Sequence, residues 1–460
     1  MPFNSVRYFV FLAAVLVVSR FVSGRFRWIV LLLASILFYA ATRAPYLLTA
    51  LLLVSVATYA GGRCVAGRAG TTKGSLLFWS FVGFDLLVLI SIKYVPAWLG
   101  ASAVVSAVGV SYYAFQAISY LVDVYAEIQP PETHFGHLAL YLAFFPKLLQ
   151  GPIERAGDLL PQLRAAVPIT YENLRAGLLL FAWGLFKKVV IADRLGLYVD
   201  WVYVDVQAHP GLPMLLATYF YAGQIYYDFS GYTDMALGSA RLFGVRLTQN
   251  FRAPYLATSI ADFWRRWHIS FSRWILDYIF KPLQMVFRSA GTAGTAVVLM
   301  VTFLVVGAWH GAKWTFVIWG LLHGMYMAAS VLTARLRRNP LPALLRKIWQ
   351  TALTFNLVSF AWIFFRANSL RDALYVVTHF VSGAGHVGRF LLSQGKGELL
   401  IALASVAVAA AGSSWDTDGI AGERLRTSPT ALRWSVYYGF TAMLLFLSAG
   451  HGGRFIYFQF

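Results

Sequence analysis

Charged residues are scarce in this chain. They make up 12% of the 460 residues, whereas 59% are hydrophobic and the mean hydropathy is +0.64. A soluble domain usually carries about 25% charged residues and is less than half apolar, so an ordinary soluble protein is excluded. Four uncharged runs approach the roughly 20 residues needed to cross a ~30 Å hydrocarbon core: 28–42, 44–62, 289–312 and 314–334. We therefore predict a polytopic membrane protein.

Cysteine and acidic residues are also rare. Cys64 is the only cysteine, which excludes an internal disulfide and argues against a thiolate metal cluster. The 38 Lys+Arg against 19 Asp+Glu give a formal net charge of +19. In a membrane protein, cytoplasmic loops rich in Lys and Arg explain such an excess better than nucleic acid binding does. We place three basic clusters in the cytoplasm and the N-terminus outside: Arg20, Arg25 and Arg27; Arg63, Arg68 and Lys73; Arg335, Arg337, Arg338, Arg346 and Lys347.

Internal repeats and long linkers are missing as well, so we expect one all-helical domain over residues 1–460. Apolar segments predict spans near 6–19, 28–43, 45–62, 76–95, 101–122, 174–192, 212–227, 291–309, 314–334, 349–365, 398–412 and 432–449. The stretch 138–163 is apolar but broken by Pro146, Gly151 and Pro152. Such a segment is tolerated at membrane depth only where protein or water satisfies its backbone. It predicts a re-entrant or interfacial element.

Polar residues, which are costly in a membrane, gather between Gln224 and Asp277. Within this region, the three- and four-residue spacing of aromatic residues predicts one amphipathic helix over 262–278, lying in the membrane interface. Asp262 and Arg266 are four residues apart on another face, where opposite charges can pair. The helix could be a simple anchor. His268, however, is on the apolar stripe, where an anchor favours another leucine.

Two further histidines occur in the apolar stretch VVGAWHGAKWTFVIWGLLHG. In a continuous helix His310 and His323 would lie ~20 Å apart on different sides, so they cannot share one site unless the chain breaks at 311–313. Either could be a buried imidazole that hydrogen-bonds a neighbouring helix. His310 is the better functional candidate because it ends one apolar run. His323 lies between Gly320 and Gly324, a spacing typical of close helix packing.

Several long motifs resemble the membrane-bound O-acyltransferase family, in the bacterial branch that acetylates alginate. They are YYDFSGYTDMALG, NFRAPYLATSIADFWRRWHIS and GAWHGAKWTFVIWGLLHG, supported by SYYAFQAISYLVDVYAEI, FFPKLLQGPIERAGDLLPQL, FAWIFFRA and the terminal FIYFQF. The likeness runs from about residue 28 to Phe460. It implies a ring of about eleven or more transmembrane helices, with re-entrant or interfacial helices, around a central tunnel.

The resemblance also implies roles for individual residues. The family's invariant histidine falls on His310 in AWHGA, which we expect to act as general base; imidazole suits this task at neutral pH. The second polar position falls on His268 in RRWHIS, which we expect to orient the donor or polarise its carbonyl. Six further residues are candidates for lining the tunnel or contacting the substrate: Asp228, Ser230, Asp234, Asn250, Arg266 and Trp309. For the charged ones, a salt bridge between helices explains their presence equally well.

The resemblance predicts a multi-pass protein of the bacterial inner membrane that takes acetyl groups from cytosolic acetyl-CoA and passes them outward for O-acetylation of a polysaccharide. It implies a separate periplasmic acetyltransferase of the SGNH type as partner, and no permanently bound cofactor. A lipid or protein acyltransferase of the same superfamily is the closest alternative. A transporter is a weaker one, because repeated halves are missing. His134 and His137 could share a helix face, but no cysteine or carboxylate is spaced to complete a metal site, so we expect none.

Overall fold

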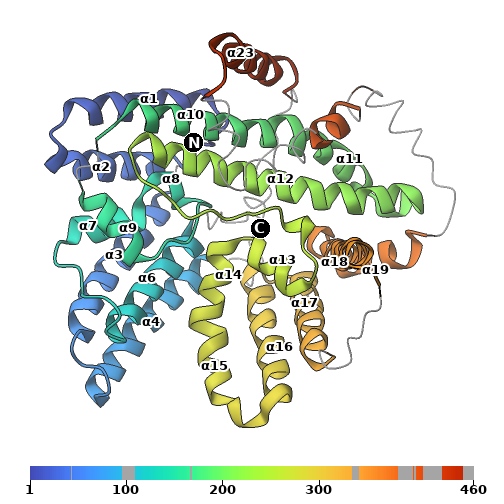
Figure 1. Ribbon diagram of the computed structural model, residues 1–460. Helices are drawn as coiled ribbons and strands as arrows, with labels where there is room; N and C mark the ends of the chain where they lie inside the picture. The colour runs from blue at the N-terminus through green and yellow to red at the C-terminus, as the bar shows by residue number, and fades with distance from the viewer. Residues whose placement is uncertain are drawn as a thin grey trace. The chain divides into compact units, whose positions relative to one another are not determined.

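The computed structural model describes residues 1–42, 44–95, 109–165, 168–333, 341–381, 397, 400–407 and 427–448. Within these ranges the regular structure is helical and contains no strand, so the all-helical prediction is confirmed (Figure 1). The predicted basic cluster at Arg335, Arg337 and Arg338, part of the predicted spans 101–122 and 398–412, the last residue of the span 432–449 and the terminal FIYFQF lie outside the described residues.

Five described helices are long and apolar enough to cross a membrane. They are α3 (Pro45–Val65), α4 (Thr72–Lys93), α17 (Trp314–Leu332), α18 (Ala343–Arg366) and the segment Arg288–His310, which contains α16 (Gly291–His310). At about 1.5 Å per residue each is close to the thickness of the hydrocarbon core. All five coincide with predicted spans.

The other predicted spans also form helices where they are described. These are α1 (Val6–Phe21), α2 (Arg27–Ala40), α6 (Val110–Tyr125), α10 (Tyr171–Phe186), α12 (Leu212–Leu242) and α23 (Thr430–Phe446). The sequence did not predict α11 (Asp193–Val204) and α19 (Leu370–His379). Nor did it predict that α12 continues past residue 227, where the predicted span ended and the polar residues gather. Asp228 and Ser230 are buried there.

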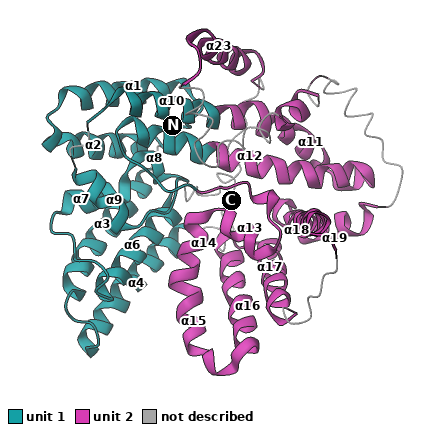
Figure 2. Ribbon diagram, in the orientation of Figure 1, with its two compact units in different colours: residues 1–184, 232–249, 457–459 teal, residues 185–231, 250–456, 460 magenta. Residues whose placement is uncertain are grey.

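The chain forms two compact units, coloured in Figure 2. Unit 1 contains Met1–Gly184 and Tyr232–Gln249, and unit 2 contains Leu185–Gly231 and the described residues after Gln249. The chain passes from one unit to the other inside α12. The single domain over 1–460 stays a prediction.

The interrupted segment at 138–163 folds in unit 1 as three short helices: α7 (Phe135–Ala143), α8 (Phe145–Leu148) and α9 (Ala156–Arg164). Lys147 is fully buried in it and donates to the side-chain oxygen of Gln116. The Tyr141 hydroxyl donates to the backbone oxygen of Glu154 at 2.8 Å. Protein groups thus satisfy part of the broken segment, as such a segment requires in a membrane. The segment is therefore broken, as its prolines and glycine suggested, and its re-entrant or interfacial position stays a prediction.

In unit 2, α16 and α17 form a closely packed hairpin (Figure 1). A methyl group added to Gly320 would lie 3.0 Å from the Cα of Gly307, and one added to Gly324 would lie 3.2 Å from the Cα of Met300. Small residues at this spacing let two helix backbones approach, which confirms the predicted packing role of Gly320 and Gly324. The packing of the hairpin therefore sets the positions of His310 at the end of α16 and His323 within α17.

Gly320→Ala is expected to destabilise the protein. The added methyl group has no room against α16, and overpacking costs about 1–3 kcal/mol. Gly83→Ala is the matched control, because Gly83 lies inside α4 with no atom within 4 Å of an added methyl group. Thermal unfolding of the detergent-solubilised protein should show a lower midpoint for Gly320→Ala and an unchanged or higher one for Gly83→Ala. Equal midpoints for the two variants would contradict the packing role.

Candidate active site

His310 is the last residue of α16, and α17 begins at Trp314. The helix therefore breaks at residues 311–313. This is the position at which the sequence analysis required a break if His310 and His323 were not to lie on one continuous helix. The His310 side chain is buried, with 7% of the residue exposed. Its ring is perpendicular to those of Trp319, at 5.0 Å between centroids, and Phe365, at 4.9 Å. Aromatic walls on two sides orient the imidazole at the end of the helix.

The single helix predicted over 262–278 is wrong. The chain forms α13 (Ile260–Arg266), breaks at Trp267 and His268, and resumes as α14 (Ile269–Ile275). His268 has φ 42°, in the left-handed region. This conformation costs a non-glycine residue about 1–2 kcal/mol, and such strained positions are concentrated at functional sites.

Asn250 explains the break at His268. Its backbone oxygen accepts a hydrogen bond from the Ile269 amide at 2.9 Å, and its side-chain oxygen accepts from the Ser270 amide at 3.1 Å and the Ser270 hydroxyl at 2.7 Å. These bonds replace the helical ones that the turn gives up. Asn250 was a substrate or tunnel candidate; the structure makes it the residue that shapes the backbone around His268.

His268 is buried, and burial lowers the pKa of its imidazole to about 3, which keeps the ring neutral at physiological pH. The Phe229 ring meets the His268 ring edge-on, with centroids 4.8 Å apart. A neutral imidazole that is held in this way can donate or accept one hydrogen bond. It can therefore polarise a carbonyl without carrying a charge into a buried site.

Phe271 lies between the two candidate histidines. Its ring centroid is 5.0 Å from that of His268 and 6.4 Å from that of His310. It also stacks on Trp309 at 4.5 Å. Although the histidines are far apart in sequence, both contact the same aromatic side chain. The sequence gave no sign of Phe271 beyond its place on an aromatic stripe.

The remaining candidates divide between the units. Asp228, Ser230, Asn250, Arg266 and Trp309 are in unit 2 with both histidines, whereas Asp234 is in unit 1. Arg266 pairs with Asp262 at 3.0 Å, as the four-residue spacing predicted. Asp228 forms a buried ion pair with Lys188, which was not a candidate.

His323 is fully buried on α17 and forms the hydrogen bond expected of a core histidine. The Trp264 indole N–H donates to its Nδ1 at 3.3 Å. The Trp319 ring lies between the two histidines of the hairpin, 5.0 Å from the ring of His310 and 5.0 Å from that of His323. The structure thus separates His323 from His310 by an indole.

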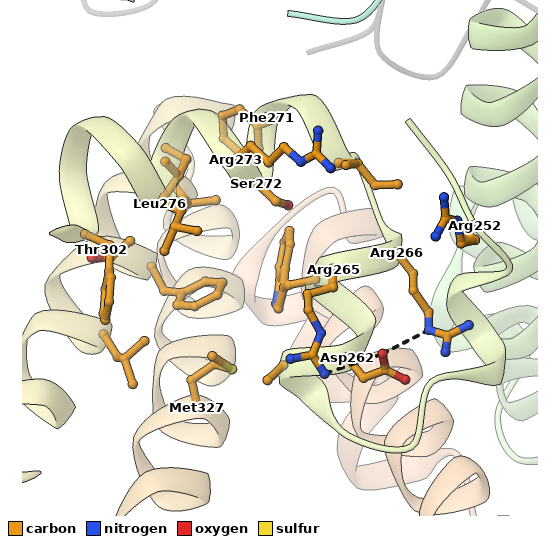
Figure 3. Close-up of a pocket in the computed structure, with 18 residues that line it drawn as sticks. Arg252, Asp262, Arg265, Arg266, Phe271, Ser272, Arg273, Leu276, Thr302 and Met327 are labelled. Carbon is orange, nitrogen blue, oxygen red and sulfur yellow. Dashed lines mark ion pairs between the residues drawn. The ribbon is translucent and has the colours of Figure 1, made fainter. Parts of the chain in front are cut away.

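A pocket of about 690 Å³ lies beside this aromatic cluster (Figure 3). One part of its lining is apolar and comes from α14, the residue that follows it, α16 and α17: Ile275, Leu276, Leu299, Phe303, Val306 and Met327. Four arginines also line it: Arg252, Arg265, Arg266 and Arg273. Phe271 belongs to the lining, so the ring that contacts both histidines is also a wall of the pocket.

The arginines give the pocket a positive side. In Figure 3, Arg252, Arg265 and Arg266 lie around Asp262 on the side away from Thr302. Burial opposes ionisation of Asp262, but its hydrogen bond with Arg266 and the nearby arginine charges lower the pKa of that carboxyl. Asp262 thus forms ion pairs with two of the four arginines, Arg265 and Arg266. Sequence reasoning noted the basic face here but proposed only Arg266 as a site residue; four arginines within 252–273 were the available signal.

The two histidines of unit 1 have a different setting. The rings of His134 and His137 lie 4.5 Å apart, and the Trp28 ring is 5.0 Å from each. Over the residues that the structure describes, no group of three or more His, Cys, Asp or Glu side chains could hold a metal ion.

Comparison with known families decides the type of chemistry. The model of the membrane-bound O-acyltransferase family matches residues 35–370, most of the chain and both candidate histidines. The chain belongs to this family. It is therefore an acyltransferase and, with its apolar helices, a multi-pass membrane protein.

Similarity to named relatives indicates the branch of the family to which the chain is related. A peptidoglycan O-acetyltransferase of Helicobacter pylori is 36% identical over 324 residues, which are 63% of this chain and 59% of the relative's length. A probable alginate O-acetylase, AlgI, of Pseudomonas aeruginosa is 34% identical over 387 residues, or 80% of this chain and 72% of the relative. A teichoic acid D-alanyltransferase of Streptococcus thermophilus is 26% identical over 318 residues, covering 62% and 75%. The suspected relationship to the alginate branch is confirmed.

Proposed function

We propose that this acyltransferase takes an acetyl group from cytosolic acetyl-CoA and passes it across the bacterial inner membrane for O-acetylation of an extracytoplasmic polysaccharide. The observation that carries the proposal is Phe271, whose ring contacts those of His268 and His310 and which also lines the arginine pocket. A donor whose phosphates bind the arginines can place its thioester toward the two histidines.

The reaction is an acyl transfer from sulfur to oxygen. The acceptor hydroxyl attacks the thioester carbonyl, its proton passes to His310, the new C–O bond forms and the C–S bond breaks. CoA leaves as a thiolate, which receives the proton from His310. His268 donates a hydrogen bond to the carbonyl oxygen, where negative charge develops; a fixed donor at this position is worth a large part of such catalysis.

The polysaccharide acceptor is supported by the relatives, since two are named for O-acetylation of alginate and of peptidoglycan. We propose that a periplasmic acetyltransferase of the SGNH type receives the acetyl group and delivers it to the glycan. A lipid or protein hydroxyl is the alternative acceptor. An SGNH-type gene beside this one, together with acetylation of glycan and not of lipid in cells that express both, would favour the polysaccharide; labelled lipid would refute it.

Neutralising two of the pocket arginines is expected to weaken donor binding selectively. Arg252 and Arg273 line the pocket and, among the described residues, form no ion pair with an acid. Arg252→Gln and Arg273→Gln should each raise the KM for acetyl-CoA about tenfold, equivalent to about 1.4 kcal/mol, with kcat nearly unchanged.

Acetyl-pantetheine is the control donor for these variants, because it has the thioester but lacks the phosphates of CoA. The variants should use it as well as the wild type does. If both donors lose the same amount, the arginines act on the fold and not on the donor phosphates. If neither donor is affected, the pocket is not the donor site.

A further inference from the structure

Lys188 is a buried lysine that no step above uses. Its ammonium group lies 2.5 Å from Oδ1 of Asp228 and 2.8 Å from Oδ1 of Asp193. All three side chains are buried in unit 2, with 1%, 2% and 6% of the side chain exposed for Lys188, Asp228 and Asp193. One cation thus serves two carboxylates in an apolar chain. We call these three residues the charge triad.

A local distortion of the backbone brings two members of the triad together. Residues Lys187–Ala192 form a π-helix, and the Asp193 amide donates to the backbone oxygen of Lys188, five residues earlier. In a regular α-helix, residues five apart point to different sides, since each residue turns by about 100°. The π-turn puts Lys188 and Asp193 on one side. Such turns are rare and occur frequently at functional sites.

Stabilisation of the fold is a weak explanation for the charge triad. Buried charges lose their hydration, and well-packed apolar residues of similar volume often stabilise a protein as well or better. What an ion pair of fixed geometry can supply is a defined orientation of the elements that carry it. Here Lys188 ties the start of α11, through Asp193, to the middle of α12, through Asp228.

The orientation of α12 matters for His268. Phe229 follows Asp228 directly, and its ring meets the His268 ring edge-on at 4.8 Å between centroids. Successive helical residues are fixed relative to each other at about 100° and 1.5 Å. Holding Asp228 therefore fixes the direction of Phe229. Phe271 also contacts the His268 ring, at 5.0 Å between centroids.

We propose that Lys188, Asp193 and Asp228 are positioning residues for His268, acting through Phe229. The inference rests on the proposed function, in which His268 polarises the donor carbonyl. A donor to a developing oxyanion must be placed to within a fraction of an ångström to be effective. The triad fixes α12 against α11, the rings of Phe229 and Phe271 both contact the imidazole, and Asn250 shapes its backbone.

A double-mutant cycle separates positioning from simple support of the fold. The rate of acetyl transfer from labelled acetyl-CoA is measured for the wild type, Lys188→Met, His268→Ala and the double variant, in the full-length protein. Lys188→Met should lower kcat at least about tenfold with the KM for acetyl-CoA within about twofold. In the His268→Ala background, which has no hydrogen-bond donor at 268, the same substitution should cost less than about twofold, because residues that act as one unit are not additive.

Additive losses in the cycle would overturn the inference, because a structural role lowers activity whichever residue stands at 268. Asp228→Asn repeats the cycle with a side chain of nearly the same shape, in case Lys188→Met does not fold. Lys281→Met is the control; it removes a lysine from an exposed ion pair with Asp277, for which little effect is expected. A wild type without activity would refute the proposed function itself, a result distinct from additivity in an active enzyme.

Discussion

His310→Ala is expected to reduce acyl transfer by at least about a thousandfold while the protein still folds and inserts. General base catalysis by a positioned side chain contributes typically 10²–10⁴-fold, and the variant leaves no group at the end of α16 to take the hydroxyl proton. The measurement is the initial rate of CoA release from acetyl-CoA by purified protein, normalised to the folded fraction from size-exclusion chromatography.

His323→Ala is the matched control for His310→Ala. It removes an equally buried imidazole from the same hairpin and leaves the Trp264 indole without its acceptor. It should lower thermal stability, and the molecules that remain folded should retain most of their turnover. A folded His310→Ala variant that kept most of its activity would refute the assignment of His310 as general base. If His323 alone proved indispensable in a folded variant, the order of the two histidines would be reversed.

Replacing His268 by glycine and by alanine should separate its chemical role from its strained backbone. Both variants are expected to lose about 10²-fold in kcat, comparable to or less than the loss for His310→Ala, since one oxyanion donor is worth that much. Only the glycine relieves the cost of φ 42°. His268→Gly should therefore unfold at a higher temperature than His268→Ala, with activity equally low in both.

Activity and unfolding temperature test two different claims about His268. Full activity in either variant would remove His268 from the reaction. Equal unfolding temperatures with low activity would leave its chemical role intact but show that the surrounding bonds of Asn250, and not the left-handed conformation, dominate the energetics of the turn.

The main features of the fold were predictable because they follow from composition and local periodicity. Long uncharged runs became helices, and the break after His310 follows from residues 311–313, which interrupt two apolar runs. The packing of Gly320 and Gly324 was equally local. In each case the determining residues are neighbours in the sequence, within reach of pattern analysis.

The features that sequence reasoning missed depend on partners far along the chain. The apolar stripe across His268 continues without interruption in the sequence, whereas in the structure hydrogen bonds to Asn250 accompany a break in the helix there. In the sequence, Lys188 is a basic residue near the end of a predicted span with no evident partner. In the structure, the π-turn and α12 bring two carboxylates to it. Periodicity carries no information on such long-range pairs, so both the site's shape and its charge triad needed the structure.

The most direct test of the account is to incubate the purified protein with acetyl-labelled acetyl-CoA, with and without the periplasmic SGNH-type partner. The account predicts bound donor, release of one CoA thiol for each acetyl group transferred to partner or water, and no release by His310→Ala. Absence of donor binding, of hydrolysis and of transfer with the partner present would contradict it.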